Sequence, residues 1–496
     1  MITASILTAT LMTSLDLTIA NVALPHIQGS VSASADQITW VLTSYIIAAA
    51  IMTPTASVLS ERFGRKNVFL VAVMGFTVTS ALCGLAQNLP QIVIFRLMQG
   101  ICGAPLMPLT QAVLMDINPP EKQGQAMAMW GMVSMVAPIM GPVLGGWLTD
   151  HLSWRWVFYI NLPIGVMALA GIWVSLPTRT FRRAPTFDLL GFLFLAVGVG
   201  SAQLMLDRGQ GQDWFSSQEI WIECMVAVIA FYLCAIQTLT ARRPFISRAL
   251  FRDPNFLAAT VFGMAIGVLM FATTSLLPPM IETLLGYPVT QAGMVMAPRG
   301  FGTLISTFFV GRLMNRFDPR LILVAGLAIL ALSMEQMSHF SLLMPATTIV
   351  VSGFIQGIGM GLLFVPLTVM AFSTLRPDLR AEGAGIFTLL RNVGSSVGIS
   401  ILSAVQISNM AVSRQELGEN LNPDNPALRT FGRNIDLSSP VSISGVVREI
   451  GRQAAMISYL DAFRLIMFIA LGCIPLLIFL RKPQAVDDSE LHPAVE

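Results

Sequence analysis

Apolar residues follow one another in long stretches along the chain, and short polar segments separate these stretches. A stretch of about 20 apolar residues is what an α-helix needs to cross the hydrocarbon core of a bilayer. The pattern therefore predicts an all-α polytopic membrane protein with about 14 transmembrane helices, near residues 3–25, 39–60, 67–86, 90–112, 125–149, 156–176, 187–206, 218–239, 256–283, 291–313, 321–340, 345–373, 383–408 and 457–480.

Basic residues are distributed unevenly over the predicted loops. If the N-terminus is cytoplasmic, the loops on that side and the C-terminal tail hold eighteen Lys and Arg, whereas the short loops of the opposite side hold only Arg155 and Arg208. Cytoplasmic loops of membrane proteins carry such an excess. We therefore expect a multi-pass membrane protein with both termini in the cytoplasm. The first stretch has no basic residues before it and is long enough to span, so we expect it to be retained.

Short motifs of the first half recur in the second. Gln99-Gly100-Ile101 returns as Gln356-Gly357-Ile358, and Pro108-Leu109-Thr110 returns as Pro366-Leu367-Thr368, at offsets of 257 and 258. Eight predicted spans separate the copies, so both copies enter the bilayer in the same direction, as in transporters that rock one half against the other. We expect an N-terminal six-helix bundle at residues 1–180 and two linker helices at 181–253. A C-terminal six-helix bundle at 254–481, with a long periplasmic loop at 409–456, and a cytoplasmic tail at 482–496 are expected to follow.

Composition excludes several function classes. Only 11% of the residues are charged and the mean hydropathy is +0.72, whereas a soluble domain has about 25% charged residues, so we expect no nucleic-acid binding. The five cysteines form no CxxC pair and the four histidines show no HExxH spacing, so neither a metal site nor a cofactor is expected. The sequence shows neither a nucleophile with a base nor paired catalytic carboxylates, so no feature of it indicates an enzyme.

Asp16 is the most conspicuous polar residue, because it lies within the first apolar stretch with no neutralising charge nearby. A charge at this depth costs at least about 2.5 kcal/mol, and such residues are usually functional and paired with a group on another helix. Arg96, in the fourth stretch, lies at a similar depth if each helix rises 1.5 Å per residue. We therefore predict that Asp16 and Arg96 pair. The pair could be purely structural or part of a proton-coupling site.

Four motifs give the chain a family resemblance that covers nearly its whole length. They are residues 15–25 of the first stretch, residues 57–66 between the second and third, Arg96 with Gln99-Gly100 and Gly103 in the fourth, and residues 141–146 in the fifth. The chain resembles the major facilitator superfamily, and within it the fourteen-span drug:proton antiporters of the EmrB/QacA type. This resemblance implies two six-helix bundles in parallel pseudo-repeat plus two inserted helices.

The motif at residues 57–66 contains Glu61, Arg62, Gly64 and Arg65. The chain must reverse here within a few residues, which favours Gly64 at the turn. The basic residues alone would hold the loop in the cytoplasm, and the resemblance implies in addition that the acidic residue helps to latch the two halves. The usual Gly of this motif is replaced by Ser57, and the usual Asp by Glu61.

The motif of the fifth stretch comprises Pro138, Gly141, Pro142, Gly145 and Gly146. Proline interrupts helix hydrogen bonds, and glycines let a neighbouring helix approach closely. The resemblance implies an antiporter seal against uncoupled leak, and the alternative is only a packing face. Residues 153–163 resemble the start of span six in the same subfamily, for which we expect an anchoring role at the interface and no chemistry.

Four further polar residues in the spans, Asn21, Gln99, Arg299 and Arg391, are expected to face a substrate cavity. The middle depths of the spans hold one clear carboxylate but three Arg, namely Arg96, Arg299 and Arg391. This balance favours neutral, zwitterionic or weakly acidic hydrophobic substrates over dications.

The function expected from this resemblance is proton-driven export of small amphipathic drugs or toxic compounds across the bacterial inner (plasma) membrane, with Asp16 as the proton carrier. A proton-coupled transporter of one specific metabolite would share the fold and is the alternative. The predicted loop 409–456, with a short helix over 446–455, could serve as the docking surface for a periplasmic adaptor protein and an outer-membrane channel, or it could be a flexible loop.

Overall fold

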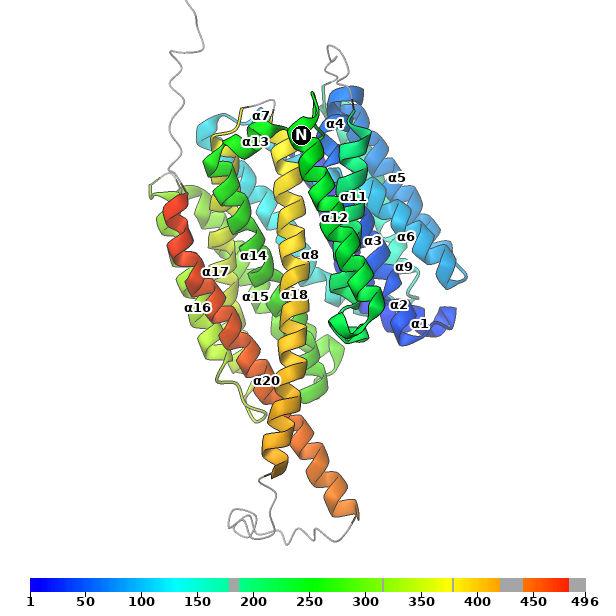
Figure 1. The fold of residues 1–496 in the computed structure, drawn as a ribbon, viewed down its shortest axis with the longest axis vertical. Coiled ribbons are helices and arrows are strands. Elements are labelled where there is room, and N and C mark those ends of the chain that lie inside the picture. The colour runs from blue at the N-terminus through cyan, green and yellow to red at the C-terminus, as the bar shows by residue number, and fades with distance from the viewer. Residues whose placement is uncertain (178–186, 315, 377–378, 420–439, 481–496) are drawn as a thin grey trace, which may run out of the picture.

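A computed structural model describes residues 1–177, 187–314, 316–376, 379–419 and 440–480, and this part of the chain is almost entirely helical (Figure 1). The predicted all-α fold is confirmed. Long helices run side by side along one common axis and form a single elongated bundle. The N-terminus lies at one end of this bundle, which we call the N-terminal face.

The first half of the chain forms ten helices in the described residues. Most of the predicted spans are single helices, but two are broken near a proline: α3 and α4 meet at an angle of 60° next to Pro54, and α6 and α7 meet next to Pro105. The helices are α1 (Ile2–Val31), α2 (Ala35–Ile38), α3 (Trp40–Met52), α4 (Thr55–Phe63), α5 (Arg65–Leu85), α6 (Leu89–Gly103), α7 (Leu106–Ile117), α8 (Pro120–His151), α9 (Trp156–Tyr159) and α10 (Asn161–Ser175).

The linker and the second half follow. The linker contains α11 (Leu189–Arg208), two short 3₁₀ turns and α12 (Gln218–Thr240). The second half contains α13 (Arg248–Arg252), α14 (Pro254–Pro279) with a π-helical turn at Met280–Leu284, α15 (Val289–Leu313), α16 (Pro319–Met337), α17 (Ala346–Ser373), α18 (Arg380–Glu419) and α20 (Pro440–Leu476).

The two halves have the same packing partners. In the first half α1 packs against α8 and α10, and α6 packs against α3 and α5; in the second, α14 packs against α18 and α20, and α17 packs against α15 and α16. A parallel sequence repeat predicts this correspondence, because equivalent helices carry equivalent apolar faces. The halves meet where α8 packs against α15 and α17, and where α18 packs against α4 and α7.

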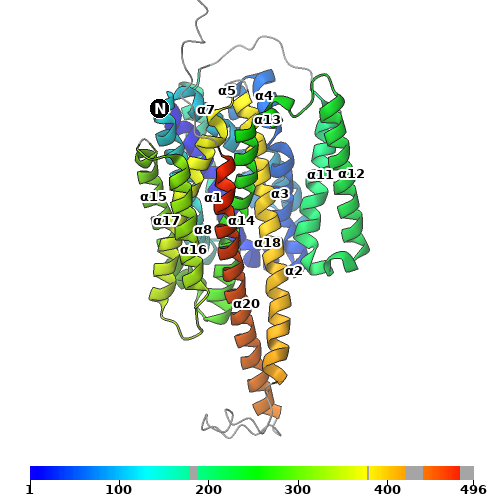
Figure 2. The ribbon, with the colours of Figure 1, turned by 60° about the vertical axis from the view of Figure 1, so that its left-hand side comes forward.

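Eleven helices in the described residues are long and apolar enough to cross a membrane, or twelve if the bent pair α3 and α4 is one span. The two remaining expected spans correspond to α8, with 32 residues, and α15, with 25, which lie within the bundle but do not satisfy the same criteria. The total of fourteen therefore stays a prediction. The linker helices α11 and α12 form a pair at the side of the bundle (Figure 2), where Gln203 of α11 donates a hydrogen bond to Ser396 of α18 at 2.8 Å.

The region expected to be a loop at 409–456 is partly helical. α18 continues to Glu419 and α20 begins at Pro440, and both helices project beyond the rest of the bundle at the end opposite the N-terminal face. The short helix expected over 446–455 belongs to α20. Hydropathy marks only the apolar part of a helix, so it does not distinguish a polar continuation of a helix from a loop. Residues 420–439 lie outside the described part, as do 178–186 of the linker flank and the tail 482–496.

Candidate functional site

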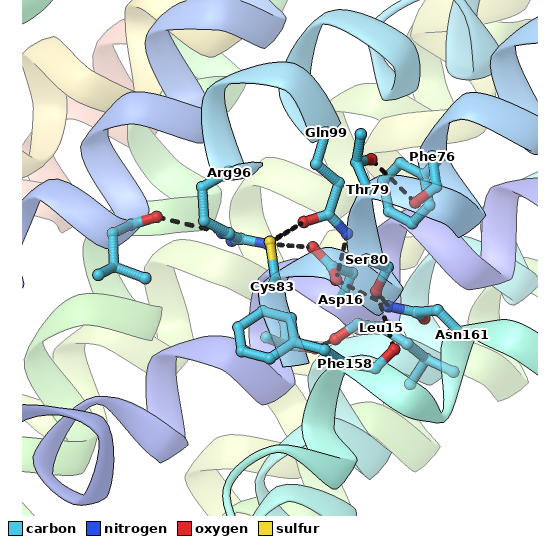
Figure 3. Close-up of polar contacts among 12 residues, drawn as sticks. Leu15, Asp16, Phe76, Thr79, Ser80, Cys83, Arg96, Gln99, Phe158 and Asn161 are labelled. Carbon is cyan, nitrogen blue, oxygen red and sulfur yellow. Dashed lines mark hydrogen bonds and ion pairs between the residues drawn. The ribbon is translucent and has the colours of Figure 1, made fainter. Parts of the chain in front are cut away.

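Asp16 lies in the middle of α1, and its side chain is fully buried. Its Oδ2 accepts a hydrogen bond from Arg96 Nη1 of α6 at 2.6 Å, and both side chains have no exposed surface (Figure 3). The predicted pairing is therefore present in the structure. A carboxylate and a guanidinium at this separation neutralise each other, which makes both tolerable inside the membrane.

Two amides hold the other carboxylate oxygen of Asp16. Gln99 Nε2 donates to Asp16 Oδ1 at 2.8 Å, and Asn161 Nδ2 donates to the same atom at 2.7 Å. Gln99 also accepts from Arg96 Nη1 through its Oε1 at 2.9 Å, so it bridges both members of the ion pair. The site thus unites α1, α6 and α10.

For the segment that contains Asn161 the sequence predicts an anchoring role and no chemistry, and the structure places the Asn161 amide in direct contact with Asp16. Asn161 is fully buried, and besides Asp16 it donates to Ser80 Oγ at 3.0 Å. Ser80 in turn donates to the carbonyl oxygen of Phe158 at 2.8 Å, which ties α5 to α9 behind the carboxylate. A polar residue in an otherwise apolar stretch was the available signal, but an amide costs less to bury than a charge and was passed over.

Arg96 keeps contacts that do not depend on Asp16. Its Nε donates to the carbonyl oxygen of Val41 at 3.1 Å, and its guanidinium carbon lies 4.5 Å from the ring centre of Tyr45 and 5.6 Å from that of Phe158. Among the described residues its Nη2 has no hydrogen-bond partner. The guanidinium therefore remains held by a carbonyl, an amide and two rings if the carboxylate becomes neutral.

Glycines of the fifth-span motif bring α8 against α1 beside this site. A Cβ at Gly141 would contact Thr18 Oγ1, and one at Gly145 would lie 3.3 Å from Ile19 Cγ2, whereas Gly146 has open space around it. Thr18 Oγ1 donates to the carbonyl oxygen of Ala137 at 3.2 Å. α8 is continuous through Pro138 and Pro142, whose side chains lie outside the described part. Close packing thus applies to Gly141 and Gly145 and not to Gly146.

The loop between α4 and α5 turns at Gly64, which has φ 84° and so confirms the expected need for glycine there. Arg65 pairs with Asp116 at the end of α7, and Arg380 of α18 lies 3.7 Å from the other oxygen of Asp116. Asp116, which sequence reasoning did not single out, thus joins both halves at the N-terminal face. Arg62 lies over the ring of Phe63 at 5.6 Å, and Glu61 is half-buried at the end of α4.

Backbones of the two halves also approach closely near the N-terminal face. A Cβ at Gly385 of α18 would lie 3.2 Å from Pro54 Cα, and one at Gly311 of α15 would lie 3.4 Å from Gln125 Cα. Further along α8, a Cβ at Gly131 would lie 3.3 Å from Val365 Cγ2 and 3.4 Å from Thr307 Cγ2, both in the second half. These contacts and the Asp116 ion pairs close the N-terminal side of the interface between the halves.

The other residues expected at a substrate cavity lie away from Asp16. Asn21 is exposed on α1 and takes no part in the Asp16 network. Arg299 of α15 donates to the carbonyl oxygen of Met270 at 3.2 Å, and Arg391 of α18 is buried with its guanidinium carbon 5.2 Å from the ring centre of Phe364. Of this expected set, only Gln99 joins the ion pair. In the described part of the chain, no group of three or more His, Cys, Asp or Glu could hold a metal ion.

Comparison with known sequences identifies the family to which the chain belongs. A profile described as Major Facilitator Superfamily matches residues 6–399. The chain belongs to the major facilitator superfamily. Within it, the chain is 34% identical to the multidrug export protein EmrB of Haemophilus influenzae over 97% of this chain and 96% of that protein, and 34% identical to the EmrB protein of Escherichia coli over 96% and 94%. The expected EmrB-type resemblance is confirmed.

Further relatives and solved structures agree with the superfamily fold. The fatty acid resistance protein FarB of Neisseria gonorrhoeae is 34% identical over 97% of this chain and 96% of that protein. The proton:xylose symporter XylE aligns with a TM-score of 0.61 and 13% identity, covering 97% of this chain and 95% of that one. Members of this superfamily are transporters and not enzymes, so the chain is a multi-pass membrane transporter.

Proposed function

We propose that this transporter exports small amphipathic compounds across the bacterial inner membrane in exchange for protons. The relatives named for multidrug export and fatty acid resistance support export of hydrophobic compounds. The observation that carries the proton-driven part is the buried Asp16, held by Arg96, Gln99 and Asn161 between three helices.

In this proposal Asp16 carries the proton. Protonation removes the negative charge and weakens the 2.6 Å contact with Arg96, and Gln99, Val41 and Tyr45 then retain the guanidinium. Helix α1 is thereby released from α6 on one side while its contacts with α8 at Gly141 and Gly145 remain. A protonation event at one buried residue can thus change how the helices of the first half pack around the cavity.

Alternating access would use the interface between the halves. The Asp116 ion pairs and the close approaches at Gly385 and Gly311 would have to separate for the N-terminal side to open. With both termini in the cytoplasm, as the distribution of basic residues favours, the present conformation is closed towards the cytoplasm. Export then requires opening of this face to load the substrate, followed by its closure.

A proton-coupled transporter of one metabolite is the alternative on the same fold. The packing of Gly141 against Thr18 and of Gly145 against Ile19 favours the antiporter, because it makes a tight helix contact next to the proton site that can act as a seal.

The experiment is pH-gradient-driven uptake of amphipathic dyes into inside-out vesicles. Wild type should accumulate several unrelated dyes, and Asp16→Asn should be inserted normally but accumulate none. Asp461→Asn is the matched control, since Asp461 is part-exposed and pairs with Arg464 along its own helix at 3.4 Å. Normal proton-driven uptake by Asp16→Asn would refute the assignment, and uptake of a single metabolite only would favour the alternative.

We also propose that the projecting ends of α18 and α20 dock a periplasmic adaptor protein that leads to an outer-membrane channel. These ends carry exposed apolar side chains, including Val412 on α18 and Ile443 and Val447 on α20, in a region that extends beyond the bundle (Figure 1). Apolar side chains on a water-exposed helix pair are typical of a surface that a partner covers.

Deletion of residues 412–447 with a short linker tests this docking surface. We expect vesicle transport to be retained while resistance of whole cells is lost. Retained whole-cell resistance would contradict the docking role, and loss of both activities would indicate a role in the transporter itself.

A further inference from the structure

Every hydrogen bond of the Asp16 carboxylate in the described part of the chain comes from a donor. Arg96 Nη1 donates to its Oδ2, and the side-chain amides of Gln99 and Asn161 both donate to its Oδ1 (Figure 3). This arrangement suits the ionised carboxylate, which only accepts hydrogen bonds. A protonated Asp16 carries an O–H donor instead, and a buried donor without an acceptor is costly.

The two amides at Oδ1 can supply this acceptor only by turning round, and Gln99 is held in its present orientation. Its Oε1 accepts from Arg96 Nη1 at 2.9 Å and from the thiol of Cys83 at 3.7 Å. A half-turn of this amide would set its nitrogen against the guanidinium, so that two donors would face each other. The bonds to Arg96 and Cys83 therefore keep the carbonyl oxygen of Gln99 away from Asp16.

Asn161 is not held in this way. Its Oδ1 is buried and has no hydrogen-bond partner among the described residues, so a half-turn breaks no bond to that oxygen and brings its nitrogen against no donor there. Its Nδ2 donates to Ser80 Oγ at 3.0 Å, and the Ser80 hydroxyl donates to the carbonyl oxygen of Phe158 at 2.8 Å. Because a hydroxyl rotates and both donates and accepts, Ser80 can donate to the turned amide oxygen.

The titratable groups beside Asp16 in the described residues are Arg96 of α6, Tyr45 of α3 and Cys83 of α5. α10 contains no ionisable residue, and neither does α8 between residues 123 and 149. The ring of Tyr159, in α9, lies against α5. A guanidinium only donates hydrogen bonds, and in this part of the chain neither Tyr45 nor Cys83 bonds to the carboxylate. The choice of acceptor therefore lies between the two amides.

We infer that Asn161 is the hydrogen-bond acceptor of protonated Asp16, and that a half-turn of its amide accompanies each protonation. The proton on Asp16 Oδ1 is then donated to Asn161 Oδ1, and Ser80 rotates with the amide. This inference rests on the proposed proton-coupled export and makes Asn161 a positioning residue of the proton site. Because Ser80 leaves the carbonyl oxygen of Phe158 in the same step, protonation of Asp16 also changes the contact between α5 and α9.

Infrared difference spectra of the purified transporter in lipid nanodiscs, recorded as a function of pH, test this role. The C=O stretch of protonated Asp16 is the band that Asp16→Asn lacks, and in wild type it should have the low frequency of a carboxyl group that donates a hydrogen bond. Asn161→Leu should shift the band upwards, whereas Asn161→Thr should keep its low frequency through the hydroxyl. Asn409→Leu is the matched control and should leave the band unchanged, because Asn409 donates to Asp461 at 3.4 Å outside the site.

The pH at which the band reaches half its height separates this role from that of a donor alone. A residue that only donates stabilises the ionised form alone, so Asn161→Leu would then raise this pH by at least about one unit. A residue that turns stabilises both forms, so we expect a change of less than about half a unit. A rise of one unit or more without an upward shift of the band would overturn the inference.

A measurement on wild type keeps the test independent of the folding of these variants. In protein isotope-labelled at the side-chain carbonyl of asparagine, one amide band should move to lower frequency at the same pH as the Asp16 band rises, because Asn161 Oδ1 gains a hydrogen bond. Absence of this asparagine signal would overturn the inference and leave the proposed role of Asp16 intact. A wild type without a titrating Asp16 band would overturn both.

Discussion

A double-mutant cycle on Asp16 and Arg96 tests whether their ion pair has the energetic weight that its burial implies. Both side chains are fully buried, and the contact of 2.6 Å is their only charge pairing in the described part of the chain. Removal of one partner from such a pair costs about 3 to 5 kcal/mol, since it leaves an uncompensated charge. Gln99 accepts a hydrogen bond from Arg96 and donates one to Asp16, and these residual bonds place both single variants towards the lower end of that range.

The double variant Asp16→Asn with Arg96→Gln leaves no charge behind and should therefore cost much less than the sum of the single variants. We expect a coupling free energy of at least about 2 kcal/mol, measured by equilibrium unfolding in mixed micelles with increasing SDS. The matched control is the pair Asp461 and Arg464, which is 3.4 Å apart and has side chains 33% and 52% exposed. Its coupling should stay below about 1 kcal/mol. Additive effects at Asp16 and Arg96 would refute the reasoning.

Two further predictions concern helix contacts. Gly141→Ala places a Cβ against Thr18 Oγ1 and should reduce proton-driven dye uptake severalfold and raise proton leak. Gly146→Ala is the control, because its Cβ meets open space, and it should leave both dye uptake and proton leak unchanged. Equal effects of the two substitutions would contradict the packing argument. Asp116→Asn removes the acceptor that Arg65 and Arg380 share and should speed hydrogen exchange at the adjoining ends of α5 and α18. Unaltered exchange would show that this ion pair does not hold the N-terminal face closed.

Features with a high cost in lipid could be predicted from the sequence. The apolar stretches gave the all-α fold because a helix is the way for this chain to satisfy its backbone inside a bilayer. Asp16 and Arg96 were found as partners because each is an isolated charge at a similar depth. Gly64 was identified because a short reversal of the chain favours a residue that tolerates positive φ.

Neutral polar residues could not be placed in the same way. Asn161 carries no charge, and its position in an apolar stretch does not by itself distinguish a site residue from one that bonds to its own helix. Only the packing of α10 on α1 brings Asn161 to Asp16. Asp116 was missed for a different reason: it lies at a helix end, where an acidic residue is ordinarily solvated, and its two partners come from helices distant in sequence.

Helix ends were the least predictable feature of the fold. The polar ends of α18 and α20 continue the helices beyond the apolar windows, because intrahelical hydrogen bonds and the contact between these two helices do not require apolar sequence. Hydropathy reports where lipid surrounds a helix and not where the helix stops.

Proton flux driven by the substrate is the most direct test of the central claim that Asp16 couples protons to export. Proteoliposomes that contain the purified transporter and a trapped pH-sensitive dye would be exposed to a substrate gradient without an imposed pH gradient. Wild type should move protons opposite to the substrate, and Asp16→Asn should move none while still exchanging substrate across the membrane. Substrate-dependent proton movement of wild-type size in Asp16→Asn would contradict the account.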